Sequence, residues 1–259
     1  MSMITNNYMN EISKVFAIGV DVLNGTRSLK NISLDLKLLA INGIVQAAKI
    51  GTNQGQSLIT LSGFLSDLPV QIAPELEELE QVSAQFARQL TVCSIAVRRY
   101  LNYSEALRNL IARVLKYSKT AYNAEDFNLL DPKVLAKLPS HPAFKNVTQN
   151  DRENIIRFAS RNQKVIELIN DLLYDAHILM NKASKKLDSI KRNGFIANYM
   201  GSNILIESSY LSSDQKSFSG LVENIKNIVK ILDEQLMKIS EDLSYGDSVI
   251  TTLIKLKSK

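Results

Sequence analysis

The sequence predicts an all-α protein, a long antiparallel four-helix bundle (coiled coil) made of two helical hairpins. Apolar residues recur every seven positions over long stretches, a pattern typical of helices that pack along their length. The 259 residues include only 10 glycines and 5 prolines, so few residues interrupt a helix. The period is lost over residues 123–150. We therefore expect a first hairpin over 1–122, a connector over 123–150 and a second hairpin over 151–259.

The first helix is expected to end at a turn near residues 51–55, a segment that contains two glycines. Ile18, Ile32 and Leu39 each lie three residues after a member of one heptad row, so these side chains share the helix face of that row. The row consists of Tyr8, Val15, Val22, Leu29, Leu36, Gly43 and Ile50.

The second helix carries a long apolar row that contains two prolines. Pro69 and Pro74 each remove a backbone donor and clash with the preceding turn, so a kink or a break near 68–74 is expected. The heptad register survives both prolines, which favours a bent but continuous helix. The row, including its cysteine and tyrosines, is expected in the core: Leu58, Leu61, Leu65, Leu68, Ile72, Leu79, Val82, Phe86, Cys93, Ala96, Tyr100, Tyr103, Leu107, Leu110, Val114 and Tyr117.

The connector contains three residue–proline pairs, Asp131-Pro132, Leu138-Pro139 and His141-Pro142, which favour turns. A short helix is expected within it at Pro132–Lys137. Asp151 is expected to be the N-cap of the third helix, because a capping residue there precedes a renewed apolar period.

The second hairpin repeats this pattern, with its turn near 211–216. A fray or kink is expected at Tyr245-Gly246-Asp247, close to the end of the fourth helix. The row of the third helix is Ile155, Ile169, Ala176, Ala183, Ile190, Ala197, Ile204 and Leu211, and that of the fourth is Phe218, Leu221, Ile225, Ile228, Leu232 and Ile239.

The two hairpins are expected to be copies of one another. Adding 161 to the residue number carries the first row onto the third and Asn42 onto Asn203, and after the turn adding 160 carries Leu58 onto Phe218. Any two heptad patterns can be aligned in this way. Here both copies also place a turn and an Asn-x-x-x-Gln/Glu pattern at the same heptad position, which favours an internal duplication.

Residues 32–58 read ISLDLKLLAINGIVQAAKIGTNQGQSL. This segment resembles the signalling tip of bacterial methyl-accepting chemotaxis proteins, which forms the hairpin turn of a long antiparallel coiled coil. The second hairpin resembles that tip over a shorter stretch, at Asn203, Glu207 and Phe218. The matching residues of the first hairpin are Leu39, Ala40, Asn42, Ala47, Ala48, Gly51 and Gly55.

The resemblance implies that the chain is a one-chain mimic of the family's dimer, whose tip binds a histidine autokinase and its coupling protein. Self-association at the tip is a further expectation. Gln46 replaces the family's glutamate, and Lys49 and Tyr210 replace its arginines. Asn42 and Asn203 could equally set the register of the coiled coil. Carried over residue by residue, the partner-binding tip consists of Asn42, Gln46, Lys49, Gly51, Gly55, Asn203, Glu207 and Tyr210.

The family is also modified on paired glutamate and glutamine residues of exposed helix faces. Glu80 and Gln81 are the nearest candidates for such a modification. An ordinary solvated helix face is the alternative explanation of this pair.

Charge and composition exclude several partners. The net charge of +5 is spread thinly, since residues 1–130 carry 12 Lys/Arg against 11 Asp/Glu and residues 131–259 carry 19 against 15. A nucleic-acid site would concentrate its basic residues, so none is expected. No apolar run is long enough for a membrane span, and a single cysteine fits a reducing compartment. We expect a cytoplasmic protein.

No enzyme, metal site or cofactor is expected. The two histidines, His141 and His177, are too few for a catalytic or metal constellation, and no phosphate-binding loop appears. The sequence thus favours a non-enzymatic chemoreceptor-like signalling or adaptor protein.

Two alternatives stay open. The first is a bundle that binds a small ligand in the connector or between helices, where small residues leave a cavity or allow close approach. The second is a structural or secreted helical effector. The small residues in question are Gly19, Gly25, Ala176 and Ala183.

Overall fold

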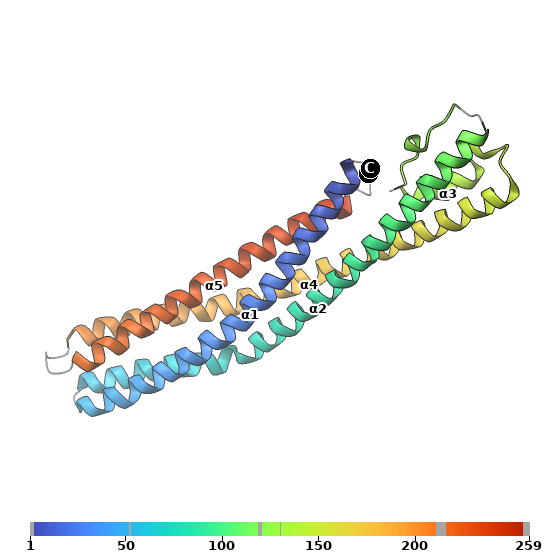
Figure 1. The fold of residues 1–259 in the computed structure, drawn as a ribbon. Helices are drawn as coiled ribbons and strands as arrows, with labels where there is room; N and C mark the ends of the chain where they lie inside the picture. Colours follow the sequence, from blue (N-terminus) through green and yellow to red (C-terminus); the bar gives the residue numbers. More distant parts are fainter. Residues whose placement is uncertain (1–2, 52, 119–120, 130, 211–215, 256–259) are drawn as a thin grey trace. The chain divides into compact units, whose positions relative to one another are not determined.

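The structure, a computed structural model, describes residues 3–51, 53–118, 121–129, 131–210 and 216–255. The described residues are almost entirely helical and contain no strand, which confirms the all-α class. Figure 1 shows the helices coloured along the chain. They are α1 (Met3–Ile50), α2 (Asn53–Ser118), α3 (Pro132–Lys137), α4 (Gln149–Ser209) and α5 (Lys216–Lys255).

The chain divides into two compact units, and each of the four long helices contributes a segment to both. Unit 1 consists of Met1–Ala17, Arg88–Ile178 and Ser248–Lys259. Unit 2 consists of Ile18–Ala87 and Leu179–Asp247. Each unit therefore contains residues from both halves of the sequence.

The first hairpin turns between Ile50, where α1 ends, and Asn53, where α2 begins. Gly51 has a φ of 67°, a left-handed conformation that glycine adopts without a steric cost. Gly55 lies inside α2, where a Cβ would stand 2.8 Å from the backbone oxygen of Ala47 on α1. One glycine thus permits the turn, and the other permits the close approach of the two helices. The second turn, expected near 211–216, falls on residues 211–215, outside the described part.

The two prolines of α2 do not divide it. The helix is continuous across Pro69 and Pro74, as the unbroken heptad register predicts. Leu68 and Ile72, on either side of Pro69, are both buried. Burial of these apolar neighbours offsets the loss of backbone hydrogen bonds that each proline causes.

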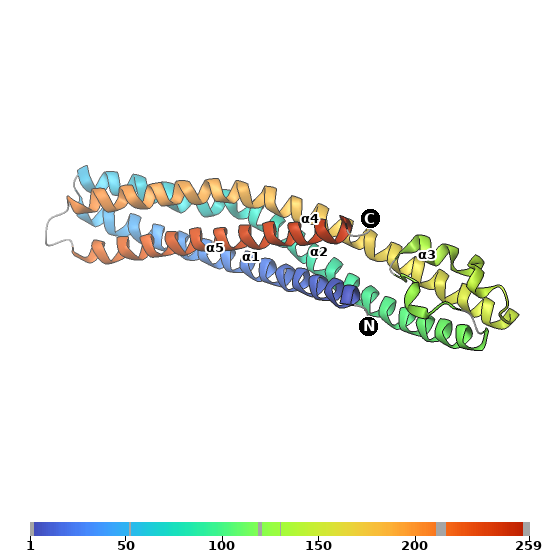
Figure 2. The same ribbon diagram turned by 90° about the horizontal axis from the view of Figure 1, so that it is seen from above.

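In unit 2 the segments of α1, α2, α4 and α5 form a four-helix bundle, with both hairpin ends at the same end of the unit (Figures 1 and 2). Helices α1 and α4 each contact both α2 and α5, so α1 and α4 occupy diagonal corners of the bundle. The contacts that define the neighbours are Gly43 with Ser62, Gly194 with Leu236, Gly25 with Ile239, and Glu78 with Lys186.

The registers of these contacts agree with the repeat expected from the sequence. A Cβ on Gly25 of α1 would lie 2.8 Å from Cγ1 of Ile239 on α5. Adding 161 to the first number and subtracting 160 from the second gives positions 186 and 79. In the structure, Lys186 of α4 forms an ion pair with Glu78 of α2, so the observed partner is one residue from the position 79 that the repeat gives. The two hairpins of unit 2 therefore pack with nearly two-fold related registers.

The predicted apolar rows form the core of unit 2. Ile32, Leu39, Leu61, Val82 and Ile228 are half-buried. The side chains of Tyr8, Leu211 and Phe218 lie outside the described part. The fully buried members of the rows in unit 2 are Ile18, Val22, Leu29, Leu36, Leu58, Leu65, Leu68, Ile72, Leu79, Phe86, Ala183, Ile190, Ala197, Ile204, Leu221, Ile225, Leu232 and Ile239.

In unit 1 the connector packs against α2. The buried hydroxyl of Tyr100 donates a hydrogen bond to the backbone oxygen of Leu129 at 3.2 Å. Tyr103 is half-buried, but Tyr117 is 81% exposed, so its predicted place in the core is wrong. Within the described residues, the buried part of the row stops at Val114, close to the end of α2 at Ser118.

The N-cap of α4 is Thr148 and not Asp151, the residue that the sequence suggested. Helix α4 begins at Gln149, and the Thr148 hydroxyl accepts a hydrogen bond from the backbone N–H of Asp151 at 3.2 Å. The same hydroxyl donates to the Asp151 carboxylate at 2.8 Å. Asp151 is thus the third residue of a capping arrangement, where its charge favours the helix N-terminus.

Of the fray or kink expected at residues 245–247, the fray is wrong, because α5 continues through them to Lys255. Gly246 is buried in unit 2, where a Cβ would overlap the methyl group of Met180 and stand 3.2 Å from Cγ2 of Ile18. The glycine therefore serves close packing of helices, which a sequence pattern cannot distinguish from a helix end.

Candidate functional site

The structure brings the predicted partner-binding residues to one end of unit 2. Asn42, Gln46 and Lys49 lie on the last turns of α1, and the contact of Gly43 with Leu221 places them beside the start of α5. Gly51 follows α1, Gly55 lies in the first turn of α2, Asn203 and Glu207 lie on the last turns of α4, and Tyr210 directly follows α4.

These residues are not equally accessible to a partner. Asn42 and Lys49 are exposed, whereas Gly55 is buried. Because Asn42 lies outside the buried layers, it cannot set the register of the bundle as a core asparagine does. The side-chain oxygen of Gln46 is buried and accepts no hydrogen bond from the described residues, so this oxygen faces the protein and not a partner. Asn203 and Glu207 are half-buried.

The same end of unit 2 carries an apolar stripe on α1 that the sequence analysis missed. Four large apolar side chains, each between 40% and 62% exposed, follow one another at intervals of four, three and four positions. This spacing places them on one helix face. The α1 stripe consists of Leu34, Leu38, Ile41 and Val45.

A second stripe occupies the corresponding positions of α4. Its members are between 54% and 76% exposed. Adding 161 to the residue number carries Leu34, Leu38 and Val45 of the α1 stripe onto three of them, while Ile41 corresponds to the exposed Ser202. The α4 stripe consists of Phe195, Tyr199 and Ile206 of α4 and of Tyr210, which directly follows the helix.

Asp35 and Lys37 lie beside Leu34, and Lys191 and Arg192 precede Phe195, but the rest of both stripes has few charges around it. Lys49 is the one charged residue from position 38 to position 66. Glu207 is the one charged residue from position 193 to position 210. At the chain's average of 22% charged residues, the first stretch alone would hold about six charges. A row of exposed apolar side chains with few charges beside it is typical of an interaction site, whereas single exposed apolar residues are not.

The candidate modification site is part of an ion-pair group between α1 and α2. The Glu80 carboxylate accepts hydrogen bonds from Arg27 and Lys30 of α1, both at 3.4 Å. Glu80 is half-buried and Gln81 is exposed. Neutralising Glu80 would therefore weaken a contact between helices as well as change the surface.

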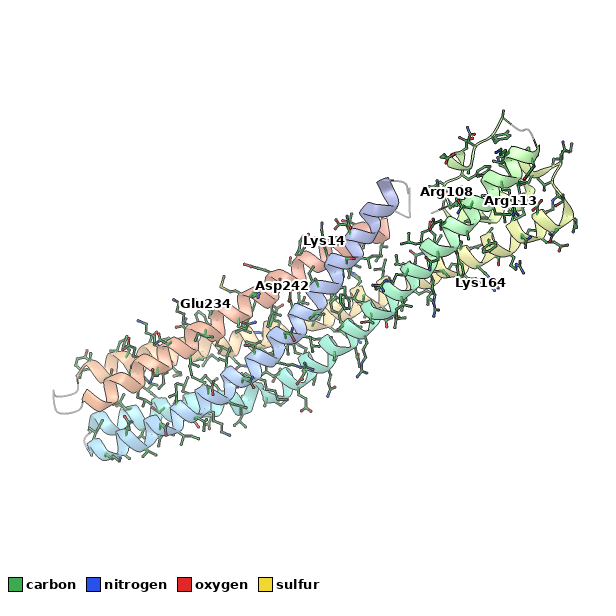
Figure 3. The ribbon with its side chains drawn as sticks, in the orientation of Figure 1. Lys14, Arg108, Arg113, Lys164, Glu234 and Asp242 are labelled. Atoms are coloured by element: carbon green, nitrogen blue, oxygen red, sulfur yellow. The ribbon has the colours of Figure 1, made fainter. Side chains whose placement is uncertain are left out.

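Elsewhere in unit 2, the carboxyl group of Asp242 on α5 (Figure 3) has a raised pKa. Burial is the largest cause, followed by the negative charge of Asp21, while Lys238 lowers the pKa and Glu241 raises it. The raised pKa means that the negative charge of this carboxylate is unfavourable in the folded protein, because the group is partly buried and close to Asp21.

The chemistry of unit 1 is sparse. Burial raises the pKa of the Cys93 thiol to about 12, so the reactive thiolate is not populated near neutral pH. Nδ1 of His141 accepts a hydrogen bond from the backbone N–H of Ala143 at 3.2 Å, and its ring meets Phe127 edge-on. Nowhere in the described ranges do three His, Cys, Asp or Glu side chains form a group that could hold a metal ion.

An open cavity of about 420 Å³ lies between α2 and α4 in unit 1. Its polar rim includes Arg113 (Figure 3), whose guanidinium is 3.3 Å from the Asp151 carboxylate. The small residues proposed to line a ligand site are elsewhere, and at Gly25 the side chains of Ile239 and Gln235 fill the available space. The cavity is lined by Ala106, Asn109, Leu110, Arg113, Asn154 and Phe158.

None of the described helices combines the length and the apolar run that crossing a membrane requires. Comparison of the chain with protein-family models, with curated protein sequences and with solved structures gives no match. The likeness to chemoreceptor tips therefore depends on residues 32–58 and their partial repeat alone, and the stripes are the feature of the site that the structure adds.

Proposed function

We propose that this chain is a non-enzymatic signalling or adaptor protein of the cytoplasm, with a chemoreceptor-like fold, that engages a protein partner through the end of unit 2. The observation that carries the proposal is the pair of exposed apolar stripes on α1 and α4, with few charges beyond those next to Leu34 and Phe195. The partner we propose is a chemotaxis-type histidine kinase with its coupling protein, or a diverged equivalent. Self-association at the same surface is a competing use of the stripes.

The free energy gained by burying the stripe side chains indicates how much surface a partner must cover. Fully burying a large apolar side chain contributes about 1.5–3 kcal/mol, so covering four half-exposed ones contributes roughly 4 kcal/mol per stripe. Association itself costs at least about 4 kcal/mol. A partner must therefore cover more than the stripe side chains, and exposed neighbours such as Phe64 of α2 add to the available apolar surface.

The test is a binding measurement with purified kinase and coupling protein from the same cell. Leu34→Lys places a charge in the α1 stripe, and Met237→Lys is the matched control, because both side chains are 55% exposed in unit 2. We expect the first variant to lose at least tenfold in affinity and the second to bind normally. Equal binding by both variants, or no binding by the unmodified chain, would refute the proposal.

A further inference from the structure

His141 joins two short 3₁₀ turns of the connector in unit 1. Its backbone N–H donates to the backbone oxygen of Leu138 at 3.2 Å, which closes the turn Leu138–Ser140. Its backbone oxygen accepts a hydrogen bond from the N–H of Phe144 at 3.0 Å, and its side chain caps the turn Pro142–Phe144. Three hydrogen bonds that shape the connector therefore meet at one residue.

The cap fixes the protonation state of the His141 ring. Nδ1 is 3.2 Å from the backbone nitrogen of Ala143, and a backbone N–H can only donate. Nδ1 must therefore carry a lone pair, and an imidazole ring has one only in its neutral form. Because Pro142 has no N–H and Ala143 is 2% exposed, this N–H is the first donor of the turn and has little access to water.

The surroundings of the ring give a protonated His141 little compensation. The ring meets Tyr122 and Phe127 edge-on, at centroid distances of 5.2 and 5.1 Å, and it has no ion pair with the described residues. Aromatic rings attract a cation more weakly than a buried donor without an acceptor costs. The guanidinium of Arg152 on α4 donates to the backbone oxygen of Phe144 at 3.1 Å, so a cation is already present beside this turn.

The carboxylates on the neighbouring elements have other partners or are exposed. The Asp126 carboxylate accepts a hydrogen bond from the backbone N–H of Asn123 at 2.7 Å, and Glu125 is exposed. The Asp151 carboxylate is 3.3 Å from the guanidinium of Arg113. The titratable and charged side chains on the elements around the ring are Tyr100 and Arg108 of α2, Tyr122, Glu125, Asp126, Lys133 and Lys137 of α3, Lys145, and Asp151 and Arg152 of α4.

We propose that protonation of His141 releases the connector, which makes the connector an acid-sensitive cover of unit 1. The neutral ring caps its turn, and the connector then keeps its apolar side chains buried and holds Tyr100 through Leu129. Protonation removes the acceptor and places two N–H groups opposite each other, so the two turns lose their common support. The connector side chains that release would expose are each at most 5% exposed: Phe127, Leu129, Leu135, Leu138 and Phe144.

The proposal concerns regulation in unit 1 and is independent of the stripes of unit 2. Hydrogen exchange of the full chain, read by mass spectrometry at about pH 8 and about pH 5, covers the range over which imidazoles change charge. After correction for intrinsic exchange rates, we expect the protection of amides at residues 135–145 to fall about tenfold or more at the lower pH. Amides at residues 58–68 of α2, in unit 2, should keep their protection.

Two variants separate His141 from other groups that titrate. His141→Asn keeps an acceptor that caps well and does not titrate, so its connector should stay protected at both pH values. The chain contains two histidines, and His177→Gln removes the other one. This control should respond to pH as the unmodified chain does. Nuclear magnetic resonance of the two imidazole rings gives the titration midpoint of His141 directly, and the loss of protection should share that midpoint.

Connector protection that persists once His141 is protonated would overturn the inference. An equal loss of protection in His141→Asn would do the same, since another group would then be the cause. If His141→Asn is already unprotected at the higher pH, the unmodified chain decides the question. Coinciding midpoints of ring titration and protection would then support the proposal, and separate midpoints would overturn it.

Discussion

Two glycines of α2 provide a matched pair for testing the close approach of α1 and α2. A Cβ on Gly55 would lie 2.8 Å from the backbone oxygen of Ala47 and 3.3 Å from Cβ of Ile50. A Cβ on Gly63 would have no atom within 4 Å. The same change, Gly to Ala, therefore meets a backbone atom that cannot rotate away at one position and open space at the other.

The structure gives opposite signs for the two substitutions. Alanine favours a helix over glycine by about 0.4–1 kcal/mol, so Gly63→Ala should raise the free energy of unfolding by that amount. At Gly55 the same gain is offset by overpacking, which costs about 1–3 kcal/mol. We expect Gly55→Ala to lower the free energy of unfolding, by roughly 1 kcal/mol net.

Urea unfolding followed by circular dichroism in the far ultraviolet measures both variants beside the unmodified chain. The midpoint should move to higher urea for Gly63→Ala and to lower urea for Gly55→Ala, with unchanged slopes. If Gly55→Ala stabilised the protein as much as Gly63→Ala, the two helices would not approach each other as closely as the structure shows. The account of the first hairpin would then be wrong.

Three further predictions concern single side chains. Tyr100→Phe removes the hydrogen bond to Leu129 and should cost about 1 kcal/mol, seen as faster amide exchange in the connector; unchanged exchange would argue against this contact. Cys93, with its pKa raised to about 12, should not react with a thiol reagent at pH 8 until the protein unfolds, and rapid reaction of the native chain would contradict its burial. Asp242 has a raised pKa in the folded state, so its charge destabilises the fold as pH rises through that value. Asp242→Asn should therefore raise the melting temperature at pH 7 and have no effect at a pH below the unfolded carboxyl pKa of about 3.9; an equal effect at both pH values would show that ionisation is not the cause.

The buried layers could be predicted from the sequence because one period governs them. Leu29, Leu36 and Leu65 share a heptad pattern, and all three are fully buried. The short helix at Pro132–Lys137 has the predicted bounds, since the Asp131 side chain caps it and proline begins it. These features depend on residues that are close together in the chain.

Features that depend on distant residues could not be predicted. The sequence suggests a fray or kink at Gly246, because it does not reveal that Met180 occupies the space beside this glycine. The two stripes were missed because only the rows facing the core were followed. The signal was present, since Leu38 directly precedes Leu39 in the predicted row and the two cannot both face the same core. Only the exposed fractions in the structure distinguish the buried rows of the core from the exposed stripes.

The assembly of each compact unit from both halves of the chain has a consequence for synthesis. The segment Ile18–Ala87 of unit 2 packs against Leu179–Asp247, so its apolar face has no native partner until the ribosome has continued from Ala87 to Asp247. At about 5–20 residues per second, that interval lasts roughly 8–30 s. During this interval, two apolar surfaces of the nascent α1–α2 hairpin are exposed to water. One is the α1 stripe, which stays exposed in the folded protein, and the other is the core face, which is buried only after folding. We expect chaperones that bind exposed apolar segments of nascent chains to bind this hairpin during translation.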